Sequence, residues 1–329
     1  LSAATLLMLA ALAGKVSQYR WRAALAATSA LLCLPMFLVA GAAANPDGPL
    51  LFCLAAFLLL AHRAHDVRGP YGLLSLVAAG LFAGLAASAK LFGLLLLPAL
   101  LVIAWRRARR SFAILSGLLA FVLGVAPVLI WNVSTNCASL RYHLVERHHS
   151  ALGLSLANVG KLFGGQLAYV SPLPFAGLLW ALFWLHRRDD FPGRRVFHWV
   201  SLPLLLAGAA LILVVPNAEP HWPAAGYIPL FAVLGHMLVD RWRSSRWIRR
   251  CSLIAAGFSG LLFVAFHVHV LTDLGVRIMP ASYVPRYDLA NELVGWDRVA
   301  SRVSEVGRSS SRPGVPLLVG GCHYTSCSQ

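Results

Sequence analysis

Ten apolar runs divide this chain, and they constrain its fold more than any other feature. Each run can cross a bilayer or form a short span that packs inside a helix bundle. The runs are Ser2–Gly14, Trp21–Ala43, Pro49–Ala61, Tyr71–Ala89, Leu91–Trp105, Phe112–Trp131, Gln166–Leu185, Val196–Val215, Ala224–Val239 and Cys251–Val270. With 59% hydrophobic residues, 12% charged residues and a mean hydropathy of +0.71, the chain of 329 residues is too apolar for a soluble domain. We therefore expect an all-α polytopic membrane protein.

Lysine and arginine cluster in alternate connections between these runs, and this asymmetry predicts the orientation. The clusters are Lys15, Arg20 and Arg22; Arg63 and Arg68; Arg106, Arg107, Arg109 and Arg110; Arg187, Arg188, Arg194 and Arg195; and Arg241, Arg243, Arg246, Arg249 and Arg250. Because basic loops stay in the cytoplasm, we expect these loops inside and the others on the external face of the cytoplasmic membrane. The net charge of +16 then comes from the basic loops. Nucleic-acid binding would need a continuous basic face, and the short separate clusters of arginine argue against it.

The composition changes after Val270, which suggests two parts. Residues 1–270 are expected to form the transmembrane bundle, with an external loop at 132–165. Residues 271–329 contain Pro280, Pro285 and the possible strand Val315–Val319, and we expect a small, incomplete α/β segment outside the membrane. Since the chain opens at Leu1 within an apolar run, it reads as a fragment of a longer protein.

The loops poor in lysine and arginine contain the residues that are unusual for a membrane protein. In the segment Asn132–Gly165, Leu140, Leu144, Val145 and Leu152 recur at near-helical spacing between charged residues and histidines. This pattern predicts an amphipathic helix on the outer membrane surface, and the alternative is a solvated loop that caps the bundle.

Asp47 lies in the turn Asn45-Pro46-Asp47-Gly48-Pro49, between two apolar runs. Proline and glycine favour a turn here, followed by a new helix. An acid at that position either caps the helix, where the helix dipole favours it, or takes part in chemistry at the membrane edge.

Lys90 interrupts the long apolar stretch from Tyr71 to Trp105. An ionisable residue in such a place often marks a functional path. Its ammonium, with Arg147 in the following external loop, would suit an anionic lipid headgroup such as a phosphate or pyrophosphate. The alternative is a lysine that reaches the interface from a helix end.

The histidines give weaker signals. His148-His149 and the pair His267 and His269 lack the helical spacing that would converge on one metal ion, which favours interfacial polar roles. His221 differs, because Pro220 and Pro223 enclose it in an external turn that would orient it toward the cavity of Asp47 and Lys90. Trp222 beside it is also typical of a membrane-interface anchor.

Several of these motifs occur in the order seen in GT-C-type membrane glycosyltransferases, and the chain resembles glycosyltransferase family 39 in particular. That family includes the bacterial relatives of protein O-mannosyltransferases and lipid A aminoarabinose transferases. The motifs that carry the resemblance are Asn45–Leu51, Gly84–Gly93, Pro127–Asn132, Arg147-His148, Tyr169–Pro174, His221–Pro223 and Gly295-Trp296.

The resemblance implies an inverting transfer of a sugar from a polyprenyl-phosphate carrier to a lipid, glycan or protein acceptor outside the cytoplasmic membrane. In such enzymes an acidic residue of the first external loop acts as catalytic base or metal partner, and an acid that matches Asp47 lies close by. The resemblance therefore implies that Asp47 is a catalytic residue of this chain and that Lys90, Arg147 and His148 bind the donor phosphate. It also places His221, Trp222 and Glu219 along the acceptor cavity. A divalent metal ion is a further expectation, with no ligand set assigned.

In such enzymes another acid lies in the first external loop, and that loop would precede Leu1. The resemblance therefore implies that this fragment lacks the first span and loop, and it leaves open whether the fragment acts alone. Two other classes stay open: a secondary transporter, because intramembrane charges also mark transport sites, and a non-catalytic membrane scaffold. Against a transporter, the two halves show no repeat and the charges gather at one face.

Overall fold

The computed structural model describes residues 1–40, 46–107, 109–144, 153–215, 218–278, 281 and 296–310, without the side chains of 38–40, 143–144 and 309–310. Within these ranges all regular structure is helical and there is no strand, which confirms the predicted all-α membrane fold. The strand predicted at Val315–Val319 lies outside the described residues.

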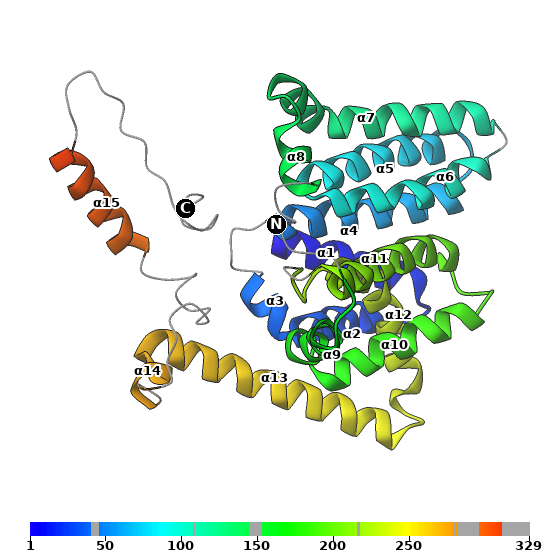
Figure 1. Ribbon diagram of the computed structural model, residues 1–329. Coiled ribbons are helices and arrows are strands. Elements are labelled where there is room, and N and C mark those ends of the chain that lie inside the picture. Colours follow the sequence, from blue (N-terminus) through cyan, green and yellow to red (C-terminus); the bar gives the residue numbers. More distant parts are fainter. Residues whose placement is uncertain are drawn as a thin grey trace.

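The helices follow one another with short connections (Figure 1). They are α1 (Ser2–Val16), α2 (Arg20–Leu32), α3 (Pro35–Ala40), α4 (Asp47–Asp66), α5 (Gly69–Ala89), the 3₁₀-helix η1 (Leu91–Leu96), α6 (Leu97–Trp105), α7 (Arg110–Ser134), α8 (Ala138–Leu144), α9 (Leu156–Tyr169), α10 (Pro172–Arg187), α11 (Arg194–Val214), α12 (Ala224–Trp242), α13 (Arg246–Thr272), α14 (Leu274–Ile278) and α15 (Trp296–Ser310).

Five of the described helices, α4, α5, α7, α11 and α13, are long and apolar enough to cross a membrane. A sixth span results if α9 and α10, which meet at an angle of 104°, count as one broken span. The helices α1 and the pair η1–α6 are apolar but shorter. The bundle therefore combines full-length spans with short helices that pack against protein.

Two predicted runs are not continuous spans. Trp21–Ala43 is interrupted at Cys33 and Leu34, where Pro35 starts a new helix because proline restricts the residue before it. Gln166–Leu185 is interrupted at Val170 and Ser171; the backbone of Ser171 has a φ of 72°, in the left-handed region, and Pro172 follows directly. Each of these two runs therefore contributes to two helices rather than to one.

The surface helix predicted in the segment Asn132–Gly165 falls partly on residues that the structure does not describe. The structure contains α8 before residue 145 and α9 from Leu156, while residues 145–152 lie outside the described part. The hydroxyl of Ser155 accepts a hydrogen bond from the Asn158 backbone N–H at 3.1 Å and so caps α9.

The five connections rich in arginine lie at one end of the bundle, where Arg107 donates to the Ala64 and Gly69 carbonyls and Tyr19 donates to Asp240. In Figure 1 the α6–α7 and α10–α11 connections lie on the right, while α8 lies on the left. We call these the arginine-rich end and the opposite end. The opposite end carries the start of α4, the junction of α5 with η1, and the loop before α12.

Small residues let α5 and α7 approach closely. A Cβ atom added at Gly84 would lie 2.1 Å from the backbone oxygen of Phe121, and one at Gly80 would lie 2.3 Å from that of Gly117. The Ser88 hydroxyl donates a hydrogen bond across this interface to the Gly124 carbonyl at 3.0 Å. Close packing of this kind holds helices together where lipid removes the hydrophobic drive, and it fixes the end of α5, where Lys90 follows.

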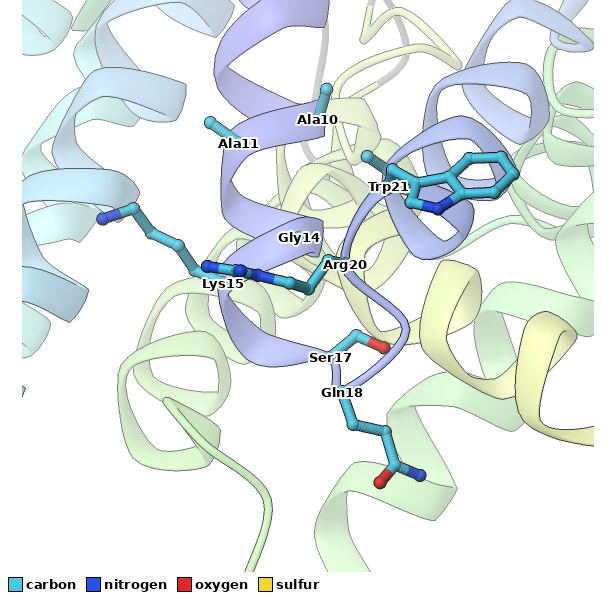
Figure 2. A pocket seen from close by; sticks show the side chains of 9 residues that line it. Ala10, Ala11, Gly14, Lys15, Ser17, Gln18, Arg20 and Trp21 are labelled. Atoms are coloured by element: carbon cyan, nitrogen blue, oxygen red, sulfur yellow. The ribbon is translucent and has the colours of Figure 1, made fainter.

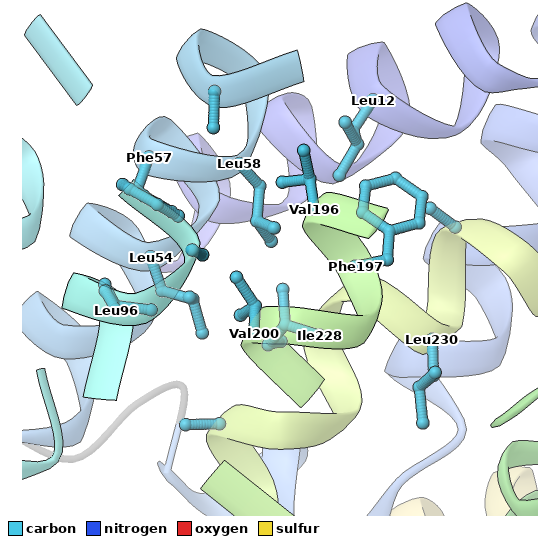
Figure 3. Packing of buried hydrophobic residues seen from close by; sticks show 14 of the residues in the cluster. Leu12, Leu54, Phe57, Leu58, Leu96, Val196, Phe197, Val200, Ile228 and Leu230 are labelled. Carbon is cyan, nitrogen blue, oxygen red and sulfur yellow. The ribbon is translucent and has the colours of Figure 1, made fainter. Parts of the chain in front are cut away.

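One hydrophobic core runs through the bundle, and α4, α11 and α12 share it. Figure 3 shows Leu54 and Phe57 of α4 beside Val200 of α11 and Ile228 of α12, and all four side chains are buried. Because these three helices share one core, the start of α4 and the loop between α11 and α12 are held in a fixed relation at the opposite end.

Candidate functional site

Three interruptions of helical structure meet at the opposite end of the bundle. They are the start of α4 at Asp47, the break between α5 and η1 at Lys90, and the loop before α12 that contains His221. Breaks of this kind at membrane depth are tolerated where they line a cavity or pack against protein. Three polar side chains far apart in the sequence are thereby brought together.

Asp47 is at the centre of this group. The Nζ atom of Lys90 donates a hydrogen bond to its Oδ1 atom at 2.7 Å, and the Nε2 atom of His221 lies 3.3 Å from Oδ2. The side chains are 22% exposed for Asp47, 21% for Lys90 and 25% for His221. The cluster is therefore largely shielded from solvent yet still reachable, as a reacting group must be.

The position of Asp47 bears on the two interpretations of this acid. Pro46 is the N-cap residue of α4, and no side chain makes a capping hydrogen bond there. Asp47 occupies the first turn, where the helix dipole favours its charge. Its two carboxylate oxygens face Lys90 and His221, however, so the dipole does not account for its neighbours.

Lys90 leaves α5 in an extended conformation, with φ −158° and ψ 139°. Its backbone N–H still bonds to the Ala86 carbonyl at 3.0 Å, and its carbonyl accepts a hydrogen bond from the Gly93 N–H at 2.8 Å. A Cβ atom at Gly93 would lie 2.1 Å from the Ala87 nitrogen, so only glycine fits this turn. The turn points the side chain of Lys90 at α4.

The loop that carries His221 is held by a buried glutamine. The Gln166 amide Nε2 donates to the Pro220 carbonyl at 2.7 Å, and its Oε1 accepts a hydrogen bond from the Tyr227 hydroxyl at 2.8 Å. Gln166 and Tyr227 are 3% and 4% exposed. Gly165 lets the loop approach, because a Cβ atom there would lie 2.3 Å from that of Pro220.

Aromatic rings surround the cluster. The Lys90 ammonium lies 5.9 Å from the centre of the Phe92 ring, and that ring packs edge-on against Trp222 with centroids 5.9 Å apart. The Tyr169 ring lies 6.3 Å from the ring of His221. Aromatic walls exclude water and strengthen electrostatic interactions between the charged groups.

The other predicted site residues have different outcomes. Glu219 is exposed in the same loop, where its backbone carbonyl accepts a hydrogen bond from the Trp222 N–H at 3.1 Å. Arg147 and His148 lie outside the described residues. The structure therefore brings Asp47, Lys90, His221 and Trp222 together.

The described residues around Asp47 offer few donors for a divalent metal ion. Among the described residues no group of three histidine, cysteine, aspartate or glutamate side chains comes together. Asp47 and His221 offer two donors, and the ammonium of Lys90 at 2.7 Å from the carboxylate would repel a cation.

Sequence reasoning missed the residues that shape this site. Gln166, Tyr227 and Phe92 were not singled out, although Gln166 is a polar residue inside an apolar stretch, and a buried amide in such a place must find partners. That signal could have identified Gln166. Nothing local distinguishes Phe92 or Tyr227 from other aromatic residues of the bundle.

Comparison with known proteins gives two findings. Residues 1–131 match the family model described as dolichyl-phosphate-mannose-protein mannosyltransferase. The chain is also 28% identical over 255 residues to lipid A galacturonosyltransferase RgtD of Rhizobium johnstonii, an alignment that covers 75% of this chain and 52% of that protein. The chain thus spans about half the length of this curated relative. No solved structure matches this chain significantly.

The family match covers α1 to most of α7, and so includes Asp47 and Lys90. The alignment with the galacturonosyltransferase extends the similarity over three quarters of the chain. Together with the helical membrane fold, these findings confirm the resemblance predicted from the sequence: this chain is similar to the GT-C-type membrane glycosyltransferases of the family 39 kind.

Proposed function

We propose that this chain is part of a glycosyltransferase that moves a sugar from a polyprenyl-phosphate carrier to an acceptor on the external face of the cytoplasmic membrane. The observation that carries the proposal is the shielded cluster of Asp47, Lys90 and His221 at the end of the bundle opposite the arginine-rich connections. Basic connections stay in the cytoplasm, which supports an external location for the cluster.

The chemistry follows from the charges in the cluster. In a single inverting displacement, the acceptor hydroxyl oxygen bonds to the anomeric carbon as the bond from that carbon to the phosphate oxygen breaks. The bonding electrons leave with the polyprenyl phosphate, whose added negative charge Lys90 stabilises, and the hydroxyl proton passes to Asp47.

The ion pair between Asp47 and Lys90 gives this reaction an order of events. A carboxylate held 2.7 Å from an ammonium is a weak base, because the cation stabilises its charge. A donor phosphate that binds Lys90 competes for the ammonium and so leaves the carboxylate able to take a proton. His221, 3.3 Å from the other carboxylate oxygen, then keeps Asp47 in place.

Arg147 and His148 complete the proposed phosphate site, and Trp222 and Glu219 the wall of the acceptor cavity. The relative acts on lipid A and transfers galacturonic acid according to its name. For this chain we propose a hydroxyl acceptor on a lipid, glycan or protein, and a hexose or uronic acid donor, with the inner membrane as its location.

The test is to incubate membranes that contain the full-length protein with a set of labelled polyprenyl-phosphate sugars and to follow the label. Transfer from one polyprenyl-phosphate donor that drops on the order of tenfold or more in Lys90→Gln, but not in Lys161→Gln on α9, supports the proposal. Transfer from a nucleotide sugar instead, or none from any lipid-linked donor, would refute it.

A further inference from the structure

A hollow of about 630 Å³ lies at the arginine-rich end, far from the cluster of Asp47, where α1 turns into α2 (Figure 2). Its rim carries Lys15, Gln18, Arg20 and Trp21, and its floor is made of small residues, among them Ala10 and Gly14. An open pocket with a charged rim and a floor of small residues matches a molecule that has a polar head and a hydrocarbon part.

The rim is positively charged. None of the lining residues is acidic, and within the described part of the chain neither Lys15 nor Arg20 forms an ion pair. Three carboxylates of the same end contact other side chains: Asp66 contacts His62 and His65, Asp189 contacts Arg194, and Asp240 contacts Tyr19. The two cations are thus available to an anion from outside the protein.

Arg20 is held in a strained backbone conformation. Its φ is 35°, in the left-handed region that residues with a side chain rarely adopt. In Figure 2 its guanidinium extends across the pocket to the side of Lys15, while the Trp21 indole lies on the other side. A strained backbone of this kind lowers the population of its conformation by a factor on the order of a few to a hundred. Residues with such strain are frequent at ligand-binding sites.

The turn that presents these residues is fixed to the rest of the bundle. The Ser17 hydroxyl lies 3.0 Å from Nδ1 of His236, and the Tyr19 hydroxyl donates to Asp240 at 2.7 Å, both on α12. The rim of the pocket therefore does not depend on a ligand to order it. A preorganised site of this kind loses little entropy on binding.

Trp21 indicates the depth of the pocket in the membrane. Its indole is 64% exposed, and the Arg22 guanidinium lies 5.4 Å from the centre of its ring. Tryptophan and arginine together are typical of the interface between headgroups and hydrocarbon. The pocket then opens at the level of lipid phosphates.

We propose that this pocket binds the headgroup of an anionic phospholipid from the leaflet at the arginine-rich end. The lipid phosphate would bridge Lys15 and Arg20, the Gln18 amide would face the headgroup hydroxyls, and an acyl chain would follow the small residues of α1 and α2. Basic pockets between helices bind anionic headgroups in this way. The site is separate from the proposed transfer site and does not depend on it.

The test compares lipid retention by native mass spectrometry of the full-length protein with phosphatidylglycerol or phosphatidylcholine. Each cation that contacts the bound headgroup contributes about a fivefold gain in affinity for it, whereas a cation outside the pocket makes no such contact. We therefore expect Lys15→Gln/Arg20→Gln to reduce phosphatidylglycerol retention on the order of 30-fold. The control pair Arg243→Gln/Arg246→Gln removes two exposed cations of the same end that do not line the pocket, and it should leave retention within about twofold of wild type.

Equal losses in both pairs would mean that general attraction to the leaflet explains retention, and would overturn the proposal. Equal retention of the two lipids by wild type would do the same. If inorganic phosphate alone stabilised the wild type in detergent against unfolding as well as phosphatidylglycerol does, the pocket would bind a free anion and the lipid proposal would be overturned. Arg20→Lys keeps the charge and should retain the lipid, which separates loss of the site from loss of folding.

Discussion

Replacement of Asp47 by asparagine separates the role of its charge from its place in a helix. Asparagine has nearly the same size and still suits a helix start, so α4 should form normally. If the negative charge of Asp47 only interacts favourably with the helix dipole, the variant should lose at most about 1 kcal/mol of stability and keep its transferase activity.

The geometry of the cluster predicts a much larger effect. Asp47→Asn removes the charge that faces Lys90 at 2.7 Å and His221 at 3.3 Å in a site where the carboxylate is only 22% exposed. Loss of a charge-assisted hydrogen bond of this kind costs about 1.5–3 kcal/mol. Loss of a general base costs about 100- to 10,000-fold in rate. We expect a drop in transfer on the order of a hundredfold or more, with expression preserved.

The assay is sugar transfer from labelled polyprenyl phosphate by full-length wild type and variant, at matched amounts of membrane protein. Asp66→Asn is the matched control, because Asp66 ends the same helix, pairs with His62 and His65, and lies at the arginine-rich end. Activity of Asp47→Asn within a few-fold of wild type, or an equal loss in Asp66→Asn, would refute the catalytic role.

Three further predictions test the parts that support the site. Gln166→Leu should cut transfer more than Tyr227→Phe, because leucine loses both hydrogen bonds, to Pro220 and to Tyr227, and the phenylalanine variant keeps the first; equal losses in the transfer assay would contradict this. Gly93→Ala should lower the free energy of unfolding by about 1–3 kcal/mol, while Gly48→Ala, with open space around it, should leave it unchanged. An unchanged melting temperature of Gly93→Ala would contradict the claim that only glycine fits this turn. Cysteines at the exposed positions Ser134 and Ser244 test the orientation: an impermeant reagent added outside should label the first only, and the reverse pattern would overturn it.

The sequence alone predicted the helical membrane architecture and the similarity to GT-C-type membrane glycosyltransferases. Apolar runs must become helices in a bilayer, because backbone groups there have no water to bond with. Asp47 and Lys90 were found because an ionisable group next to such a run is costly and therefore conspicuous. Apolar composition alone did not locate the breaks inside two of the runs, where new helices begin at Pro35 and Pro172.

Only the tertiary structure decided which of these groups meet. Asp47 and Lys90 are 43 positions apart, and His221 comes from a third element, so their contact depends on how α4, α5, α11 and α12 pack. The close approach of α5 to α7 and the hydrogen bonds of Gln166 set that packing. A local sequence pattern cannot predict which distant residue a side chain will contact. Sequence periodicity determines which residues form helices, because backbone hydrogen bonds are local, whereas side-chain contacts between helices depend on the whole bundle.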